Sequence, residues 1–231
     1  MTICANCGHY GAGHYCSECG NPFKVKRITL SSLLHEVTHT FTHLDKGFGY
    51  TLKELTLRPG KMQKRYLSGE RRRFQKPFSM FFICASITGL AFYWLTRQAS
   101  GSTDIEKAQE YFIKNYFVIL QCVLLPFFAL VTWFLFGGKD LNYAETLVLF
   151  VYTLAFAFLL IIPFNSLHLL IKSKWMPYAD LPVMAVYVVW TNLNFFNKQR
   201  RWIVITKSIF MLLIGWFTSN LIAEQIVIRM A

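Results

Sequence analysis

The chain has 231 residues, of which 54% are apolar, and its net charge is +12. So large an apolar share, including 22 phenylalanines, argues against an ordinary water-soluble domain. A basic balance can indicate nucleic-acid binding. Here, however, more than half of the 24 Lys and Arg residues precede the first long apolar run, where such residues orient membrane proteins and meet anionic lipid. We therefore expect these basic residues to interact with membrane lipids and not with nucleic acid.

The first twenty residues contain four of the six cysteines, in two Cys-x-x-Cys-Gly turns. Each such turn presents two sulfurs from one backbone bend, and four thiolates are a common ligand set for structural zinc. We predict a zinc ribbon over residues 1–24 with a structural Zn²⁺, because a closed four-thiolate site has no position for a catalytic water. The predicted ligands are Cys4, Cys7, Cys16 and Cys19. Redox-active thiols are the alternative, and His9 and His14 are alternative ligands.

Residues 25–77 are basic and form the second predicted region, made of amphipathic and interfacial helices. Apolar residues recur at helical spacing from Leu30 to Leu44, which predicts an amphipathic helix. His35, His39 and His43 lie on its other face, and we interpret them as solvated, with a metal-binding or pH-sensing role as the alternative. A second helix is predicted from a capping box at Thr51 to Glu54, ending near Arg58-Pro59-Gly60.

The segment from Lys61 to Lys76 alternates basic and apolar side chains, which is typical of an interfacial segment. We predict that its charges bind anionic lipid or a protein partner, while Met62, Tyr66, Leu67 and Phe74 enter the headgroup region. The predicted binding residues are Lys61, Lys64, Arg65, Arg71, Arg72, Arg73 and Lys76.

Residues 78–231 contain long, nearly uncharged runs, each close to the ~20 residues that cross a bilayer as a helix. The fold class predicted is therefore an all-α integral membrane protein, with a five-helix transmembrane bundle after the zinc ribbon. The five spans are expected at 78–96, 112–136, 144–171, 179–197 and 203–224. The fourth has a polar second half with Thr191, Asn192 and Asn194, so a re-entrant or interfacial helix is its alternative.

Several short motifs carry a resemblance to known proteins. They are Leu44-Asp45-Lys46-Gly47-Phe48, Tyr50-Thr51-Leu52-Lys53-Glu54-Leu55, Arg58-Pro59-Gly60-Lys61, Tyr66-Leu67-x-Gly69-x-Arg71, Lys76-Pro77-Phe78-Ser79 and Asn142-Tyr143-Ala144-Glu145. Together they resemble a family of bacterial membrane proteins classified as domain of unknown function 3667, and the two cysteine turns resemble the short zinc ribbons that begin many bacterial membrane proteins. The resemblance covers the head and the first part of the body closely and the last two spans loosely. It implies a bacterial inner-membrane protein and supplies no activity.

The distribution of Lys and Arg predicts the orientation of the chain. A cytoplasmic head places most basic residues on that side, together with Lys139 and the cluster of Lys198, Arg200 and Arg201. With five spans, the N-terminus is then cytoplasmic and the C-terminus lies on the other side of the membrane. We expect a multi-pass protein of the cytoplasmic, or inner, membrane.

The residues support a binding function better than a catalytic one. No nucleophile, phosphate-loop or metalloprotease motif is present, so we expect a membrane-anchored protein that binds a protein partner or anionic lipid through its cytoplasmic zinc ribbon and basic segment. The main alternative is a transporter or channel component built on a polar site in spans three to five, where Asn165 and His168 follow Pro163. A lipid-modifying enzyme is a weaker alternative, and homo-oligomerisation stays open.

Overall fold

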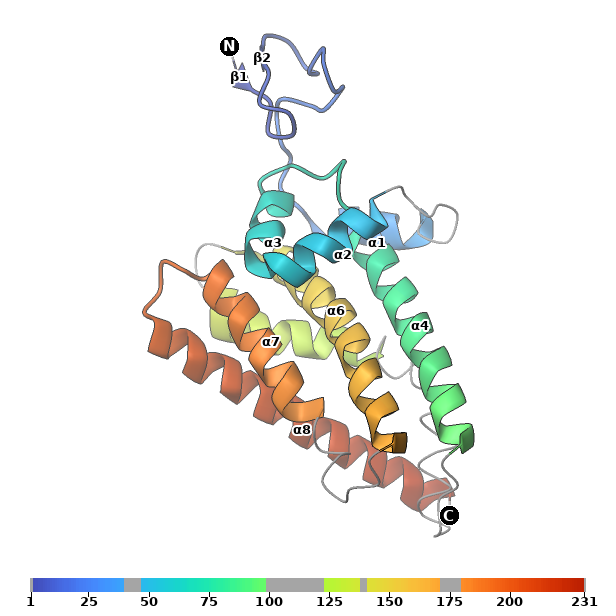
Figure 1. Ribbon diagram of the computed structural model, residues 1–231. Coiled ribbons are helices and arrows are strands. Elements are labelled where there is room, and N and C mark those ends of the chain that lie inside the picture. Colours follow the sequence, from blue (N-terminus) through green and yellow to red (C-terminus); the bar gives the residue numbers. More distant parts are fainter. Residues whose placement is uncertain (1, 40–46, 99–122, 138–140, 171–179, 231) are drawn as a thin grey trace.

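The computed structural model describes residues 2–39, 47–98, 123–137, 141–170 and 180–230, without some side chains near the helix ends. It is mostly helical, with a small cysteine-containing head at the N-terminal end. Figure 1 shows the head standing above short helices, which in turn cover one end of a group of longer helices. The predicted helical class is confirmed.

The head is held together mainly by short backbone pairings. Strands β1 (Thr2–Ile3) and β2 (Tyr10–Gly11) pair antiparallel, with Ile3 opposite Tyr10. A second antiparallel bridge joins Tyr15 to Pro22. A segment of this size cannot be stabilised by so few apolar contacts. The head therefore needs another source of stability.

Three short helices follow the head: α1 (Leu30–His39), α2 (Phe48–Leu57) and α3 (Pro59–Leu67). The predicted apolar face of α1 is only partly right, because Leu33 is buried while Leu30 and Leu34 are exposed. His35 is exposed; the side chain of His39 and the whole of His43 lie outside the described residues.

The start predicted for the second helix at Thr51 is wrong. Helix α2 begins at Phe48, and no side chain caps it. The Thr51 hydroxyl instead donates to the Gly47 carbonyl and accepts a hydrogen bond from the Gln75 backbone N–H, at 2.8 and 2.7 Å. The buried Thr51 side chain therefore ties α2 to the segment before α4, which is why it is not available as a cap. The predicted end near Arg58 agrees with α2 and α3 meeting at that residue.

Three described helices are long and apolar enough to cross a membrane: α4 (Pro77–Gln98), α6 (Tyr143–Leu170) and α8 (Arg201–Met230). At about 1.5 Å per residue, even the 22 residues of α4 reach about 33 Å, more than the ~30 Å of a hydrocarbon core. Within the apolar window of each helix, 56% of α6 is buried but only 17% of α8. Helix α6 is thus the central helix, whereas α8 presents most of its apolar surface outward.

The other two expected spans are shorter in the described part of the chain. Helix α7 (Asp180–Phe195) has 16 residues, and the apolar helix Val123–Phe136 is shorter than the length of a span, with the π-helical turn η2 (Trp133–Gly137) at its end. Residues 112–122 and 179 of the two expected spans lie outside the described residues. The five-helix bundle is therefore not confirmed, and its second and fourth spans stay predictions.

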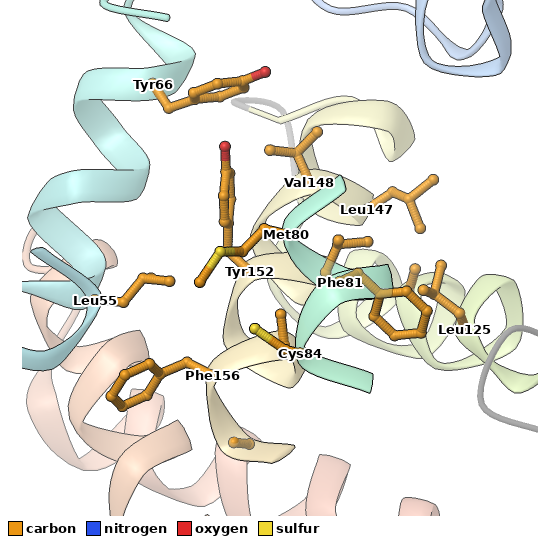
Figure 2. Close-up of a cluster of buried hydrophobic side chains, with 14 of the residues drawn as sticks. Leu55, Tyr66, Met80, Phe81, Cys84, Leu125, Leu147, Val148, Tyr152 and Phe156 are labelled. Atoms are coloured by element: carbon orange, nitrogen blue, oxygen red, sulfur yellow. The ribbon is translucent and has the colours of Figure 1, made fainter. Parts of the chain in front are cut away.

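The hydrophobic core lies where α2, α3, α4 and α6 meet, close to the head end of the longer helices. Figure 2 shows Leu55 and Tyr66 facing Tyr152 of α6, with Phe81 and Cys84 of α4 on the other side. The rings of Tyr66 and Tyr152 meet edge to face, with centroids 5.3 Å apart. The short helices α2 and α3 are thus packed onto the longer apolar helices as part of one core.

A close backbone approach joins α3 to α7. A Cβ placed on Gly60 of α3 would lie 2.5 Å from both the backbone N of Phe195 and the carbonyl oxygen of Thr191. Only glycine allows this contact, which brings the end of α7 and the following turn at residues 196–200 to the end of the molecule where α3 lies. A hydrogen bond of 2.6 Å from Lys64 Nζ to Asn197 Oδ1 closes the same junction.

Candidate metal centre and basic end

The two cysteine turns have the same backbone geometry. In each turn the N–H of the first cysteine donates to the carbonyl five residues later, and the N–H of the glycine donates back to the carbonyl of that cysteine, at 2.8 to 2.9 Å. The glycines adopt positive φ, 77° at Gly8 and 65° at Gly20, which explains why this residue type follows each second cysteine. The groups are Cys4, His9 and Gly8 in the first turn, and Cys16, Asn21 and Gly20 in the second.

The four sulfurs of Cys4, Cys7, Cys16 and Cys19 converge, with every pair within 4.8 Å. The closest pairs cross between the turns, at 3.5 Å for Cys4 to Cys19 and 3.5 Å for Cys7 to Cys16. A tetrahedral zinc site with Zn–S bonds of ~2.3 Å places its sulfurs ~3.8 Å apart. The predicted cysteine cluster is therefore confirmed as an arrangement that could hold a metal ion; zinc as that metal belongs to the proposal below.

The sulfurs differ in how readily they lose a proton when no metal is bound. The backbone N–H of Asn21 is the main cause that lowers the pKa of Cys19 to about 6. The pKa of Cys7 is raised to about 12: a backbone hydrogen bond from His9 lowers it, but desolvation and the neighbouring thiols outweigh that effect. One thiolate among thiols is the expected state of such a cluster, because four adjacent negative charges repel each other.

The histidines between the cysteine turns are not part of the cluster. His9 Nε2 lies 3.3 Å from the hydroxyl of Ser17, and His14 is exposed. Among the described residues, only the four cysteines form a group of His, Cys, Asp and Glu side chains close enough to share a metal ion. A closed set of four thiolates suits a structural ion, as the sequence predicts.

The linker after the head is fastened to the body at four successive residues. Val25 packs against Gly69, whose φ of 112° and lack of a Cβ make room for it. The carbonyl of Lys26 accepts a hydrogen bond of 3.0 Å from Arg71. The remaining two contacts are made by Arg27 and Ile28 with the start of α6.

The start of α6 combines a helix cap with this anchor. The Glu145 N–H donates to Asn142 Oδ1 at 2.8 Å, and the Asn142 N–H donates to Glu145 Oε2 at 3.0 Å, which is a capping box. Two nitrogens of Arg27 donate hydrogen bonds to the same carboxylate, at 2.7 and 2.8 Å. Asn142 Nδ2 donates to the Ile28 carbonyl. The Asn142-Tyr143-Ala144-Glu145 motif therefore both starts α6 and holds the linker.

The seven basic residues expected to bind lipid or a partner do not form one surface. Arg65 is an internal group: it donates to both carboxylate oxygens of Glu70, to Glu54 at 3.0 Å and to the Tyr50 hydroxyl at 3.1 Å. Arg71 is held by the carbonyls of Lys26 and Tyr66. Four of the seven are exposed, namely Lys61, Arg72, Arg73 and Lys76. The seventh, Lys64, is half-buried against Asn197.

The expectation that apolar side chains of this segment enter the headgroup region is wrong for Met62, Tyr66 and Phe74. Their exposed fractions are 0%, 4% and 3%, because they pack into the core between α2, α4 and α6. An alternation of basic and apolar residues indicates that the apolar side chains are shielded from water, but not whether lipid or protein shields them. Here they are shielded by protein.

The structure adds a second basic segment beside α3. The turn between α7 and α8 and the first residue of α8 bring Lys198 and Arg201 near Lys64, which donates to Asn197 of the same turn. Sequence reasoning placed this cluster on the side of the head but did not include it in the binding site. The basic residues at 198–201 were the only indication of this segment in the sequence. Their position beside α3 could not be predicted, because it depends on the contact of Gly60 with α7.

The structure does not test the predicted intramembrane polar site. The backbone of α6 passes through Asn165 and His168, with Pro163 inside the helix, but the side chains of Asn165 and His168 lie outside the described residues.

The fold and the cysteine cluster define a class: a mostly helical protein with three helices that could span a membrane and a small head that could hold a metal ion. Residues 45–89 match a family model described as Protein of unknown function (DUF3667), in agreement with the resemblance noted in the sequence. The match covers α2, α3 and the first half of α4, including Arg65 and its partners, and leaves the cysteines of the head outside it. No curated protein and no solved structure matches the chain.

Proposed function

We propose that this protein is anchored in the bacterial inner membrane by its long helices, carries a structural zinc in a cytoplasmic head, and binds anionic lipid at the end of the molecule where the head lies. The role is one of binding and not of catalysis. The five spans, the outward C-terminus and the division at residues 24 and 77 are parts of the same proposal.

The observation that carries the proposal is the gathering of basic groups at one end of the apolar helices. Lys61 and Lys64 of α3, the exposed residues Arg72, Arg73 and Lys76, and the cluster at 198–201 all lie beside the ends of α4, α7 and α8 nearest the head. Basic residues near spans favour the cytoplasmic side and attract anionic headgroups, each by up to about 1 kcal/mol.

A test of lipid binding uses the full-length protein extracted from its native membrane with the surrounding lipid. We expect the extracted patch to be richer in anionic lipid than the bulk membrane, and the variant Arg72→Gln, Arg73→Gln, Lys76→Gln to lose part of that enrichment. The control Lys172→Gln, Lys174→Gln changes charges that the sequence places on the other side, and it should keep the enrichment. A patch with the composition of the bulk membrane contradicts the proposal.

A protein partner for the head is the second candidate, and the exposed side chains of the head support it. Ile3, Tyr10 and Tyr15 are exposed by 57%, 68% and 69%, and Ile3 and Tyr10 lie side by side as cross-strand neighbours. Large apolar and aromatic side chains displayed on so small a unit are typical of contact surfaces.

The head test compares variants of the full chain in affinity capture from membranes. Tyr10→Ser, Tyr15→Ser should lose the same specific partner as Cys7→Ser, Cys19→Ser, because the first removes the surface and the second the fold of the head. His14→Ala should keep the partner. If the same proteins are captured with all variants, the head has no specific partner.

The transporter and lipid-modifying alternatives stay predictions. Each depends on polar side chains at membrane depth, and Asn165 and His168 fall outside the described side chains.

A further inference from the structure

A cleft lies between α3 and the turn that joins α7 to α8. Its volume is about 270 Å³, slightly below the ~300 Å³ at which pockets for drug-sized ligands begin. Its apolar lining consists of Leu193 and Phe196, and among the described residues no carboxylate lines it. The polar lining consists of Lys61, Lys64, Asn194, Asn197, Gln199 and Arg201.

The positive charges of this cleft are not neutralised within the part of the chain that the structure describes. Neither Lys61 nor Arg201 makes an ion pair there. Lys64 donates to the neutral oxygen of Asn197 at 2.6 Å and lies 5.5 Å from the centre of the Phe195 ring, so neither partner carries a negative charge. Burial, and then the nearby charge of Lys198, lowers the pKa of Lys64. Like charges held together on a partly buried surface raise the energy of the empty cleft, and an anion would relieve that cost.

We propose that this cleft binds the phosphate group of an anionic phospholipid. Arg201 offers a planar fork of N–H donors suited to phosphate oxygens, and the two lysines add point charges. Asn197 uses its oxygen for Lys64, which leaves its amide N–H groups to donate to an anion. The inference rests on the proposed function and assigns its lipid-binding role to specific residues.

The position of Arg201 favours a lipid over free phosphate. Arg201 is the first residue of α8, a helix long and apolar enough to cross the membrane. Ile205 and Ile209 follow at steps of four residues, so they lie on the same side of the helix as Arg201, and both are exposed. Trp202, 63% exposed, lies at the same level, where aromatic residues mark the membrane interface. A headgroup in the cleft would thus have its acyl chains along α8.

The test measures lipid binding by the full-length protein in neutral detergent micelles. Phosphatidylglycerol, phosphatidylcholine and inorganic phosphate are titrated in separate arms. We expect phosphatidylglycerol to bind most tightly, and the variant Lys64→Gln, Arg201→Gln to weaken its binding by about tenfold or more. Because Lys64 also contacts Asn197, the single variant Arg201→Gln, which removes no contact within the described fold, should already weaken binding by several-fold.

The matched control is Lys53→Gln, Arg58→Gln, which removes the same charge from exposed residues that neither line the cleft nor belong to the basic groups assigned to lipid binding. It should change the affinity for phosphatidylglycerol by less than about twofold. Equal weakening by the cleft and control variants would overturn the inference, because the effect would then come from overall charge. Binding of inorganic phosphate as tight as that of phosphatidylglycerol would overturn the choice of a lipid.

The same titrations separate this inference from the proposed function. If the unaltered protein prefers phosphatidylglycerol to phosphatidylcholine and the cleft variants leave that preference intact, the cleft is not the site, while lipid binding by the basic end stands. If the unaltered protein shows no preference between the two lipids, the lipid-binding proposal fails as well.

Discussion

At the scale of single residues, we expect the cysteine cluster to determine whether the head folds. The head has two short backbone pairings and few apolar contacts, so the proposed metal would supply its stability, which is an apparent ~10–16 kcal/mol in zinc-folded peptides. Ligand identity can therefore be tested by metal content and by the structure of the head together.

We expect one zinc ion per chain in the purified full-length protein and none in the variant Cys7→Ser, Cys19→Ser, because each change removes one sulfur from a different turn. The control His14→Ala alters an exposed residue of the same segment and should keep the metal. Elemental analysis of the detergent-solubilised protein gives the metal and its amount. Zinc retained by the double variant would show that these cysteines are not its ligands.

Zinc binding by the head should weaken as the pH falls. Zinc binds thiolates, so protons compete with it; below about pH 6 even Cys19, whose pKa is lowered to about 6, takes up its proton. Stability supplied by the metal is thus present at neutral pH and lost on the acid side. Zinc release to a colorimetric chelator, followed between pH 7 and pH 4.5, measures this. Release that does not depend on pH would contradict thiolate ligation.

Arg65 is expected to act in folding and not in lipid binding. It joins Glu54, Glu70 and Tyr50, and its guanidinium lies 5.2 Å from the centre of the Phe74 ring. Since the Arg65 side chain is 35% exposed and its carboxylate partners only 10–13%, Arg65→Gln should destabilise the protein by about 1–3 kcal/mol. Lys61→Gln, on the exposed side of the same helix, should leave the melting temperature in detergent nearly unchanged.

At the scale of helices, the contact between α3 and α7 has a strict size limit. Gly60→Ala places a Cβ 2.5 Å from backbone atoms of α7, so α3 must move, and we expect a loss of several kcal/mol. Gly49→Ala is the matched control: Gly49 also lies in a short helix, with no atom within 4 Å of the added Cβ. It should be neutral or stabilise the protein by up to about 1 kcal/mol. Thermal unfolding of both variants tests this contact. Similar losses of stability in the two variants would contradict it.

The long helices could be predicted from the sequence, and the contacts between them could not. Apolar runs from Phe78 and Ala144 place α4 and α6 to within two residues, because length and composition alone decide a span. The start of α2 was missed, since Thr51 pairs with Gln75, 24 residues away. Likewise, the pattern at Tyr66 and Phe74 did not reveal whether lipid or protein covers them.

One part of the candidate site could likewise be predicted from the sequence, and the other part could not. Cysteine spacing is a local signal, so the cluster could be predicted residue by residue. The cleft beside α3 could not, because Lys64 and Arg201 are far apart in sequence and meet only when α7 packs on Gly60.

For the molecule as a whole, we expect all exposed basic groups near the head to lie on one side of the membrane. Cysteines introduced one at a time at Lys53 and Gln199, in a chain without Cys84 and Cys122, should both react with an impermeant reagent from the cytoplasmic side, beyond the labelling that the four head cysteines give in the parent chain. A cysteine at Ser102 should add labelling only from the other side. Labelling of positions 53 and 199 from opposite sides would contradict the arrangement in which the α7 to α8 turn lies beside α3.

The anchored linker limits where the head can meet other molecules. From Val25 to Ile28 the chain is fixed to the body, and Pro22 still belongs to the head through its bridge with Tyr15. Phe23 belongs to the head as well, because its N–H donates to the His14 carbonyl at 3.1 Å and its ring packs against Gly11. Only Lys24 remains between the two, and one extended residue spans about 3.5 Å. The head is therefore held close to the body, which in the proposed arrangement places it near the bilayer surface. Any molecule that recognises it must itself come to the membrane, so recruitment and surface contact would occur in one step.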